Sequence, residues 1–515
     1  MTIKLHHKIQ TVVMKIHFEG LDAGFAAQDA LSEYFYLTIS PEIERIMDSK
    51  VGVNSVLNIQ NLALDCGTIP YENWETGLVE TIKRKLSHEL QAMSGAQVSI
   101  SHSLQENYWM TFMHFLEKGH LPWSVSESNL SDLPTTLSLT NNQLAEFAMS
   151  FKASSNFYKR FASSISTKPK AFLLQQFLTH SDALTKKLFR RLLLDLDYKS
   201  DFFNWLFLSL VEVFDNQKYV SFKAFFTTAL SQQEKRTTIG SKEFKLLAKA
   251  IHESSTTYSS ITKEIKDVFN ERINPTFQQN SIKLLHQLSE LSSEEKVRRK
   301  YKNWINDLYQ QNSNAPWKIE KRGFLKTPDL DALQHKTPNR SNSAIKTKDE
   351  DALFVGNAGM VIFHPFLPVL FDEIDGMLHE EGKTICKDAC LEVMEFLVHG
   401  ENDHGEEFYI MNKILCGRDP ADVFTPKLNL PEKMKKEADD LIKEVIGHWG
   451  VLNHPSLEGF RETFLQRNGK LTQVQKGWRL EVEKKGVDVL MGSLPWGLNI
   501  ITYPWTEKIL FVEWN

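Results

Sequence analysis

Four side chains able to bind a metal ion follow one another closely near the end of a predicted helix. They are His399, His404, Glu406 and Glu407, and two cysteines four residues apart, Cys386 and Cys390, precede them. Imidazole, thiolate and carboxylate groups bind Zn²⁺ in proteins. A zinc site built on cysteines, however, usually shows two close cysteine pairs, and only one is present here. We therefore interpret the histidines as solvated loop residues and the cysteines, with Cys416, as small buried apolar residues.

A second string has some features of a phosphate-binding loop. Two glycines, Gly376 and Gly382, are followed by Lys383 and Thr384. Such a loop needs four residues between its glycines, because its length sets how the backbone amides converge on the phosphates. Here there are five, two of them glutamates that would repel phosphate. We expect no nucleotide site, and interpret the string as a helix that ends at a loop.

No other pattern marks a catalytic centre. The chain has no Gly-x-Ser-x-Gly turn and no two-histidine zinc helix, and nothing near the acidic pair Asp195 and Asp197 marks it as catalytic. The basic clusters at 186–191 and 296–300 have the spacing of solvated helix faces rather than of a nucleic-acid surface. The sequence therefore predicts no catalytic, cofactor-binding or metal-binding residues, no enzyme activity and no nucleic-acid partner.

Composition indicates a folded chain of several domains. Its 515 residues are 42% hydrophobic and 24% charged, with four cysteines, too few for a disulfide scaffold. The N-terminus lacks the apolar segment of a secretion signal, and no apolar stretch reaches the roughly 20 residues of a membrane span. We expect a soluble protein made in a reducing cytoplasm. Charge is uneven: residues 151–350 carry 34 Lys and Arg against 21 Asp and Glu, whereas the chain as a whole has a net charge of −5.

Residues 1–128 are predicted to form an N-terminal α+β domain with a β-α-β unit. Alternation of apolar residues predicts a strand over 12–18, and a second strand, with a bulge near residues 60–61, is predicted over 56–64. A four-residue apolar row predicts a helix over 71–92. That row consists of Leu78, Ile82, Leu86 and Leu90.

Residues 129–311 are predicted to be a helical middle region, followed by a polar linker over 312–352. Helical periodicity recurs over 172–178, 184–194, 202–214, 244–251 and 282–291. Pro169, Gly240 and Pro275 separate these helices, so we expect a series of short helices and not one rod. The linker is rich in Asn, Ser, Thr and Pro and poor in large apolar residues.

Residues 353–515 are predicted to form a C-terminal α/β domain ending in antiparallel strands. Pro431 marks the start of an amphipathic helix that Gly450 can end. A short helix over 456–467 and strands over 478–482, 498–502 and 509–514 complete the pattern. The predicted fold class is mainly α with α+β end domains.

Several short strings of this chain are similar to motifs of the contractile injection system tape measure family. Ile59–Gly67 resembles the opening of that family, and Phe115–Trp123 resembles its "FL.tG.LPW" phrase. The C-terminal matches begin at Asn357-Ala-Gly359 and His364–Pro368. They continue with Asn412–Gly417, His448-Trp449, Glu458–Arg467, Gly477-Trp478, Leu494–Gly497 and Tyr503–Trp505. Together the matches cover about residues 8–125 and 353–515. One departure is His399-Gly400, where the family pattern continues with a small residue and Thr-Gly.

The resemblance implies a structural protein of a phage-tail-like contractile particle. The implied role is a tape measure that sets inner tube length, or a factor that initiates tube assembly at the baseplate. The alternative is a compact adaptor or assembly chaperone that binds tube or baseplate subunits without measuring length. Implied partners are inner tube and baseplate proteins, with self-association left open. The implied location is the cytoplasm during assembly, with the extracellular particle as a later one. The family has no catalytic residues to carry over, and Trp123, Trp496 and Trp505 are interpreted as packing residues, with partner contact as the alternative.

Overall fold

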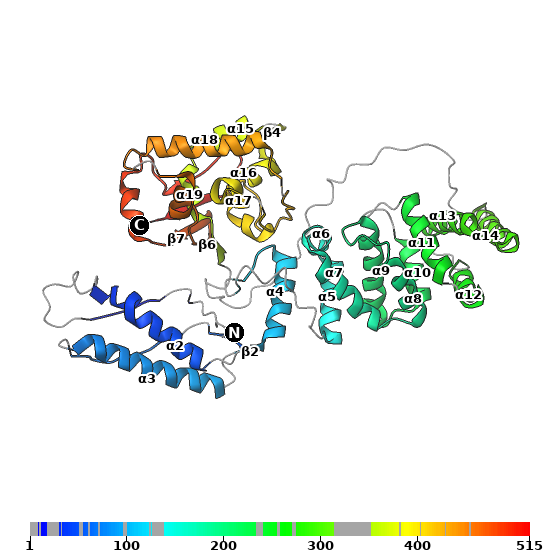
Figure 1. The fold of residues 1–515 in the computed structure, drawn as a ribbon, viewed down its shortest axis with the longest axis horizontal. Helices are drawn as coiled ribbons and strands as arrows, with labels where there is room; N and C mark the ends of the chain where they lie inside the picture. The colour runs from blue at the N-terminus through cyan, green and yellow to red at the C-terminus, as the bar shows by residue number, and fades with distance from the viewer. Residues whose placement is uncertain are drawn as a thin grey trace. The chain divides into compact units, whose positions relative to one another are not determined.

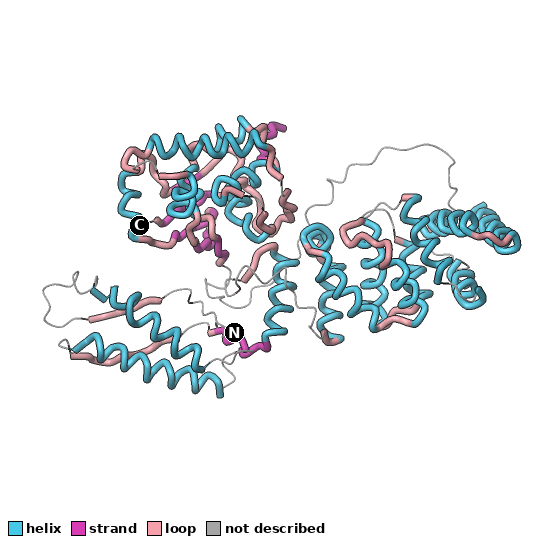
Figure 2. The backbone as a smooth tube through the Cα atoms, in the orientation of Figure 1, coloured by secondary structure: helices cyan, strands magenta, loops and turns pink. Residues whose placement is uncertain are grey.

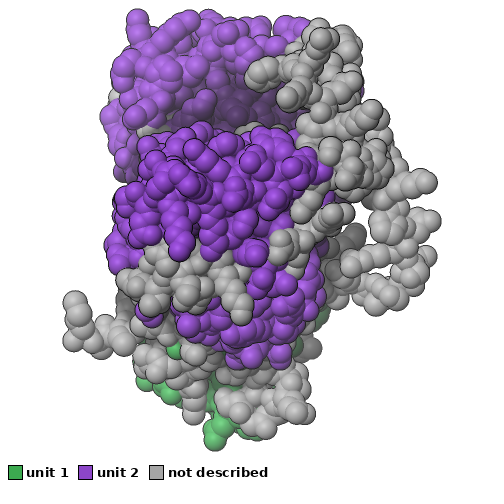
Figure 3. Space-filling view, turned by 90° about the vertical axis from the view of Figure 1, so that its right-hand side faces the viewer, with its two compact units in different colours: residues 1–113, 124–132 green, residues 114–123, 133–515 purple. Residues whose placement is uncertain are grey.

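The computed structural model divides into two compact units. Figures 1 and 2 follow the backbone through its helices and strands. Unit 1 comprises residues 1–113 and 124–132, and unit 2 comprises residues 114–123 and 133–515 (Figure 3). The structure describes residues 9, 12–17, 30–31, 33–50, 55–59, 62–70, 73–95, 100–122, 125, 139–232, 240–254, 258–269, 274–313, 352–380, 383–401, 403–427, 429–452 and 455–514. Within these ranges every helix is too short or too polar to cross a bilayer.

Unit 1 contains a β-α-β arrangement, but it is built from other elements than the predicted unit, which began with a strand over 12–18. Strand β1 (Ser55–Asn58) pairs antiparallel with β2 (Ile100–Ser103), and α3 (Trp74–Gly95) lies between them in sequence. The π-helix η1 (Phe35–Ile39) leads into α2 (Ser40–Lys50), which packs on α3, and α4 (Leu104–Lys118) follows β2. The predicted apolar row supplies Ile82, Leu86 and Leu90 to the buried face of α3.

The prediction of a strand over 12–18 is wrong for the residues of this segment that the structure describes. Residues 12–17 form no regular secondary structure, and Val12, Val13, Met14 and Ile16 are exposed. Alternating apolar residues produce a strand only where a neighbouring strand satisfies the backbone N–H and C=O groups, and none of the described strands pairs with this segment. The second predicted strand is confirmed over its first residues as β1, and the bulge predicted near residues 60–61 lies outside the described residues.

The middle of unit 2 is a series of short helices, as predicted. They are α5 (Asn141–Ala153), α6 (Ser155–Ser164), α7 (Thr167–Thr179), α8 (Ala183–Leu192), α9 (Asp201–Gln217), α10 (Phe222–Ser231), α11 (Ser241–Ser254), α12 (Tyr258–Phe269), α13 (Pro275–Leu291) and α14 (Glu295–Ser313). Many of them begin at a polar residue whose side chain accepts a hydrogen bond from a first-turn amide. These residues include Ser154, Asp182, Ser200, Ser221 and Asn274.

Phenylalanine rings from four of these helices form one core. Phe147 of α5 lies 5.4–6.2 Å, between ring centroids, from Phe157 of α6, Phe177 of α7 and Phe207 of α9. All four rings are fully buried. Helix α9 is buried on every side over 202–211, mostly by apolar residues, the pattern of a helix surrounded by others. The middle is therefore held together by packing between helices that are distant in sequence.

The end of unit 2 combines helices with a five-stranded sheet. The strand order is β3 (Leu353–Val355), β6 (Gly469–Val474), β7 (Gly477–Val482), β9 (Ile509–Glu513) and β8 (Ile500–Ile501). The β7–β9 pair is parallel and the other neighbours are antiparallel. The associated helices are η5 (Ala358–Phe363), α15 (Leu367–Glu373), α16 (Asp388–His399), η6 (Glu406–Tyr409), α17 (Ile410–Leu415), α18 (Glu432–His448), α19 (Leu457–Phe460), η7 (Arg461–Leu465) and η8 (Gly486–Ser493).

The predicted fold class, mainly α with α+β ends, is confirmed. Among the described residues, strands occur only before residue 104 and after residue 352 (Figure 2). The string compared with a phosphate loop forms a hairpin of β4 (Met377–Glu380) and β5 (Lys383–Cys386), which replaces the loop that we expected after α15. Residues 314–351, most of the predicted linker, lie outside the described residues.

Candidate functional site

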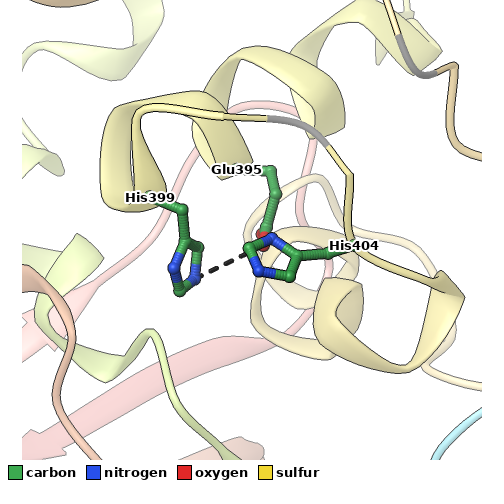
Figure 4. A group of neighbouring side chains, drawn as sticks. All are labelled: Glu395, His399 and His404. Carbon is green, nitrogen blue, oxygen red and sulfur yellow. Dashed lines mark ion pairs between the residues drawn. The ribbon is translucent and has the colours of Figure 1, made fainter.

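Two of the four residues first considered as metal ligands come together in the structure, with a third that the sequence analysis missed. His399 Nε2 lies 3.4 Å and His404 Nδ1 lies 3.0 Å from the same carboxylate oxygen, Glu395 Oε1 (Figure 4). Helix α16 carries Glu395 and His399 one turn apart, which places both on one face. The four-residue spacing between them was the available signal. We call these three residues the Glu-His-His cluster.

The loop after α16 brings His404 back to the helix. Gly400 ends α16 with φ of +75°, a left-handed conformation that glycine adopts without strain. The ring of His404 then stacks on Phe408, with 4.4 Å between ring centroids, and its centroid lies 4.4 Å from that of His399. The loop thus fixes the imidazole of His404 over the carboxylate.

Buried side-chain amides hold the Glu395 carboxylate through its other oxygen, Oε2. The side chain of Glu395 is fully buried, whereas those of His399 and His404 are 17% and 21% exposed. Asn412 Nδ2 donates to Glu395 Oε2 at 3.3 Å and to the Leu391 carbonyl at 2.9 Å, and Asn357 Nδ2 donates to Asn412 Oδ1 at 2.8 Å. The neighbouring Glu395 carboxylate raises the pKa of His404, against an opposing effect of burial. The cluster can therefore hold a positive charge at its centre.

Glu406 lies apart from this cluster, in a buried ion network. The guanidinium of Arg160 contacts both Glu406 oxygens, with Nε–Oε2 at 3.0 Å and Nη2–Oε1 at 3.1 Å, and Lys413 Nζ lies 2.9 Å from Oε1. The side chains of Arg160 and Glu406 are fully buried and that of Lys413 nearly so. Burial lowers the pKa of Lys413, and Glu406 opposes that shift. We call these three residues the Arg-Glu-Lys network.

The Arg-Glu-Lys network joins three segments of unit 2. Arg160 belongs to α6, and its Nη1 and Nη2 donate to the carbonyl oxygens of Leu116 at 2.7 Å and Ala421 at 2.8 Å. Gly119 has φ of +79°, and a Cβ there would lie 2.6 Å from Arg160 Nη2. The phrase 115–119, which resembles a family motif, therefore packs directly against this network. Its glycine provides both the backbone conformation and the space for the guanidinium.

The other motif residues also make structural contacts. Trp496 Nε1 donates to the Ile362 carbonyl and Trp505 Nε1 to the Leu415 carbonyl, both at 2.9 Å. Gly359 has Phe464 O where a Cβ would stand, only 1.8 Å away. The indoles of Trp496 and Trp505 thus pack and hydrogen-bond within unit 2, as interpreted from the sequence. Trp123 lies outside the described residues.

The remaining residues singled out in the sequence belong to neither the Glu-His-His cluster nor the Arg-Glu-Lys network. The three cysteines of unit 2 lie side by side, with side-chain hydrogen bonds between Cys386, Cys390 and Cys416. Cys386, Cys390 and Cys416 are buried, and the described cysteines are all free thiols. Cys390 Sγ lies 3.1 Å from the Gly376 carbonyl oxygen, and burial raises the pKa of Cys416. Asp195 forms an exposed ion pair with Lys249, at 2.8 Å. The structure does not bring these groups to the Glu-His-His cluster.

A half-buried histidine pair predicts a measurable pH dependence of stability. His114 Nε2 lies 3.3 Å from His120 Nδ1, and burial lowers the pKa of His120 to about 4 and also lowers that of His114. The unfolded chain, with a histidine pKa near 6.5, binds more protons between pH 4 and 6.5. The free energy of unfolding should therefore fall as pH drops through that window, by about 3 kcal/mol at most from His120. Denaturant unfolding at pH 7.5 and pH 4.5 measures the change.

The histidine prediction is checked by comparison with variants, because other groups titrate in the same range. His120→Gln should lose part of the drop in stability between the two pH values. His448→Gln, which changes an exposed residue of α18, should keep the whole drop. Equal drops in the two variants would contradict the prediction.

Comparison with known protein families agrees with the motif resemblance. The family model described as contractile injection system tape measure protein matches residues 6–514. No curated protein and no solved structure matches the chain. The match spans both units, including the helical middle for which the sequence analysis found no motif. The chain therefore belongs to the contractile injection system tape measure protein family.

Proposed function

We propose that the chain acts in particle assembly as a folded adaptor between inner tube and baseplate proteins, and that it does not set tube length by its own extension. Membership of the family implies a structural role together with other components of a contractile injection system. The more specific role of an adaptor is our own proposal. We also infer that the role involves no catalysis, and that it begins in the cytoplasm and continues in the extracellular particle.

The buried core of the helical middle is the observation that carries the proposal. As one continuous helix, residues 141–313 would span about 260 Å at 1.5 Å per residue. Among the described helices of that region the longest, α14, has 19 residues and spans about 28 Å. Extending the middle would expose Phe147, Phe161, Phe177 and Phe207, at a cost of roughly 1.5–3 kcal/mol for each ring. A ruler would have to recover that free energy from contacts inside the tube.

Inserting residues between α10 and α11 and into the predicted linker tests the proposal. We would insert about 40 Gly and Ser residues at 336–343 in one variant and at 233–239 in another, and image the particles by electron microscopy. An extended ruler would lengthen the tube by up to about 130 Å, since an extended residue spans about 3.3 Å. The adaptor should give tubes of unchanged length.

In the matched control the same 40 residues follow Asn515, so they lengthen neither the middle nor the linker. Particle number in each strain reports whether the inserted chain still supports assembly. Tubes that lengthen with either internal insertion, but not with the control, would contradict the adaptor and favour the tape measure.

A further inference from the structure

The distances within the Glu-His-His cluster match those between ligands of a tetrahedral metal ion. With metal–ligand bonds of about 2.0–2.1 Å, two ligands of a tetrahedral zinc ion lie about 3.3–3.4 Å apart. Glu395 Oε1 lies 3.0 Å from His404 Nδ1 and 3.4 Å from His399 Nε2. One ligand atom from each of the three residues lies within 4.8 Å of those of the other two. Small side-chain adjustments would bring them around one ion.

The orientation of the buried atoms also points to a missing central group. Glu395 Oε1 and His404 Nδ1 are both buried, and neither has a hydrogen-bond partner in the described part of the chain, although they lie 3.0 Å apart. The ion pair between them offsets only part of the cost of burying both atoms, because neither atom has a hydrogen-bond partner among the described residues. A cation between them would satisfy both at once.

The surroundings supply the outer contacts that a metal site needs. Asn412 orients the carboxylate from its buried side through a hydrogen bond to Glu395 Oε2. The exposed Asp403, whose Oδ1 lies 3.9 Å from His404 Nε2 and so beyond hydrogen-bond distance, places a negative charge beside that imidazole. Such outer partners hold the ligands in place and raise their basicity. The partial exposure of both imidazoles leaves an entry path for the ion and room for a water molecule as fourth ligand.

We propose that Glu395, His399 and His404 bind one Zn²⁺ ion. Two imidazoles and one carboxylate form a ligand set that suits zinc. The bound ion would fix the loop that leads from Gly400 to Glu406 and so to the Arg-Glu-Lys network. This proposal replaces the sequence expectation of no metal site, and it does not depend on the proposed adaptor role.

Metal titration of the purified full-length chain tests the proposal. The chain is first stripped with chelator, and Zn²⁺ is then added in a calorimeter, with Co²⁺ in a parallel spectroscopic titration. We expect one ion per chain with a dissociation constant in the micromolar range or below, and the absorption bands of tetrahedral Co²⁺. Zinc should also raise the midpoint of thermal unfolding, because a ligand that binds the folded state stabilises it.

Variants locate the ion. His399→Gln and His404→Gln should each weaken binding about 100-fold or more, since loss even of an outer partner costs 10–100-fold, and should abolish the thermal shift. Both residues are partly exposed, and the circular dichroism of each variant reports whether it is folded. His448→Gln, an exposed histidine elsewhere, should bind zinc as the unchanged chain does.

Two results would overturn the proposal. One is the absence of stoichiometric binding to the unchanged chain. The other is binding that persists in folded His399→Gln and His404→Gln chains and disappears when His6 and His7 are both changed to Gln, which would place the ion on the N-terminal histidine pair.

Discussion

Replacing Arg160 with Met should lower the free energy of unfolding by about 3–5 kcal/mol, the usual cost of breaking a buried ion pair by removing one partner. The substitution preserves much of the apolar stem and removes the guanidinium. It leaves the buried Glu406 carboxylate without its bidentate partner. It also removes the guanidinium donors from the carbonyl oxygens of Leu116 and Ala421, the second of which keeps Asn156 Nδ2 as a donor at 3.2 Å. Lys413 remains, but a single ammonium group cannot replace those donors. Denaturant unfolding of the full chain, followed by circular dichroism, measures the loss.

Arg299→Met provides the matched control for the Arg160 variant. Arg299 also pairs with a glutamate, Glu295, at 3.3 Å, but its side chain is 75% exposed. An exposed pair contributes about 0–1 kcal/mol, because water screens the attraction and already solvates both charges. The two variants lose the same kind of group and differ in burial. If Arg160→Met were as stable as Arg299→Met, the Arg-Glu-Lys network would not hold the three segments together.

The second large effect is expected at Gly359. A Cβ at this position would lie 1.8 Å from the backbone oxygen of Phe464 and 2.7 Å from the Cα of Leu465. Backbone atoms cannot rotate away as a side chain can, so Gly359→Ala must push η5 away from η7 in the centre of the core. Overpacking usually costs about 1–3 kcal/mol, and occasionally more. We expect at least the upper end of that range, measured as a lower midpoint of denaturant unfolding.

Gly447→Ala is the control for the Gly359 variant. Gly447 lies within α18, and nothing stands within 4 Å of the position of its Cβ. Alanine is the better helix former, so this substitution should raise stability by about 0.5–1 kcal/mol. The same chemical change should therefore have opposite signs at the two glycines. A Gly359→Ala chain as stable as the unchanged chain would contradict the close approach of η5 and η7.

The local patterns of the sequence were sufficient to predict most of the helices. The periodicity over 172–178, 184–194 and 202–214 corresponds to α7, α8 and α9, and that over 282–291 falls within α13. A helix makes its backbone hydrogen bonds within one segment, so its pattern is complete in the local sequence. A strand depends on a partner elsewhere. That is why the alternation over 12–17 was misleading, although it was as regular as that of the strand confirmed at Gly477–Val482.

The candidate site was only partly visible in the sequence. His399 and His404 attracted attention because they lie close together in sequence with Glu406 and Glu407. Glu395 did not, because the sequence of an apolar helix does not show whether a glutamate within it is buried. Its burial depends on the other elements that pack against the helix. Its full burial and the hydrogen bond from Asn412 depend on α17 packing against α16.

By itself the sequence determined the family, the mainly helical fold class and the absence of any recognisable catalytic motif, because short motifs and helical periodicity are properties of neighbouring residues. Only the tertiary structure decided what the charged residues do. In the sequence Glu406 was considered only as a possible metal ligand, yet it is the buried partner of Arg160, 246 positions away. No local pattern records such a pairing, because desolvation of a charge depends on every segment that covers it.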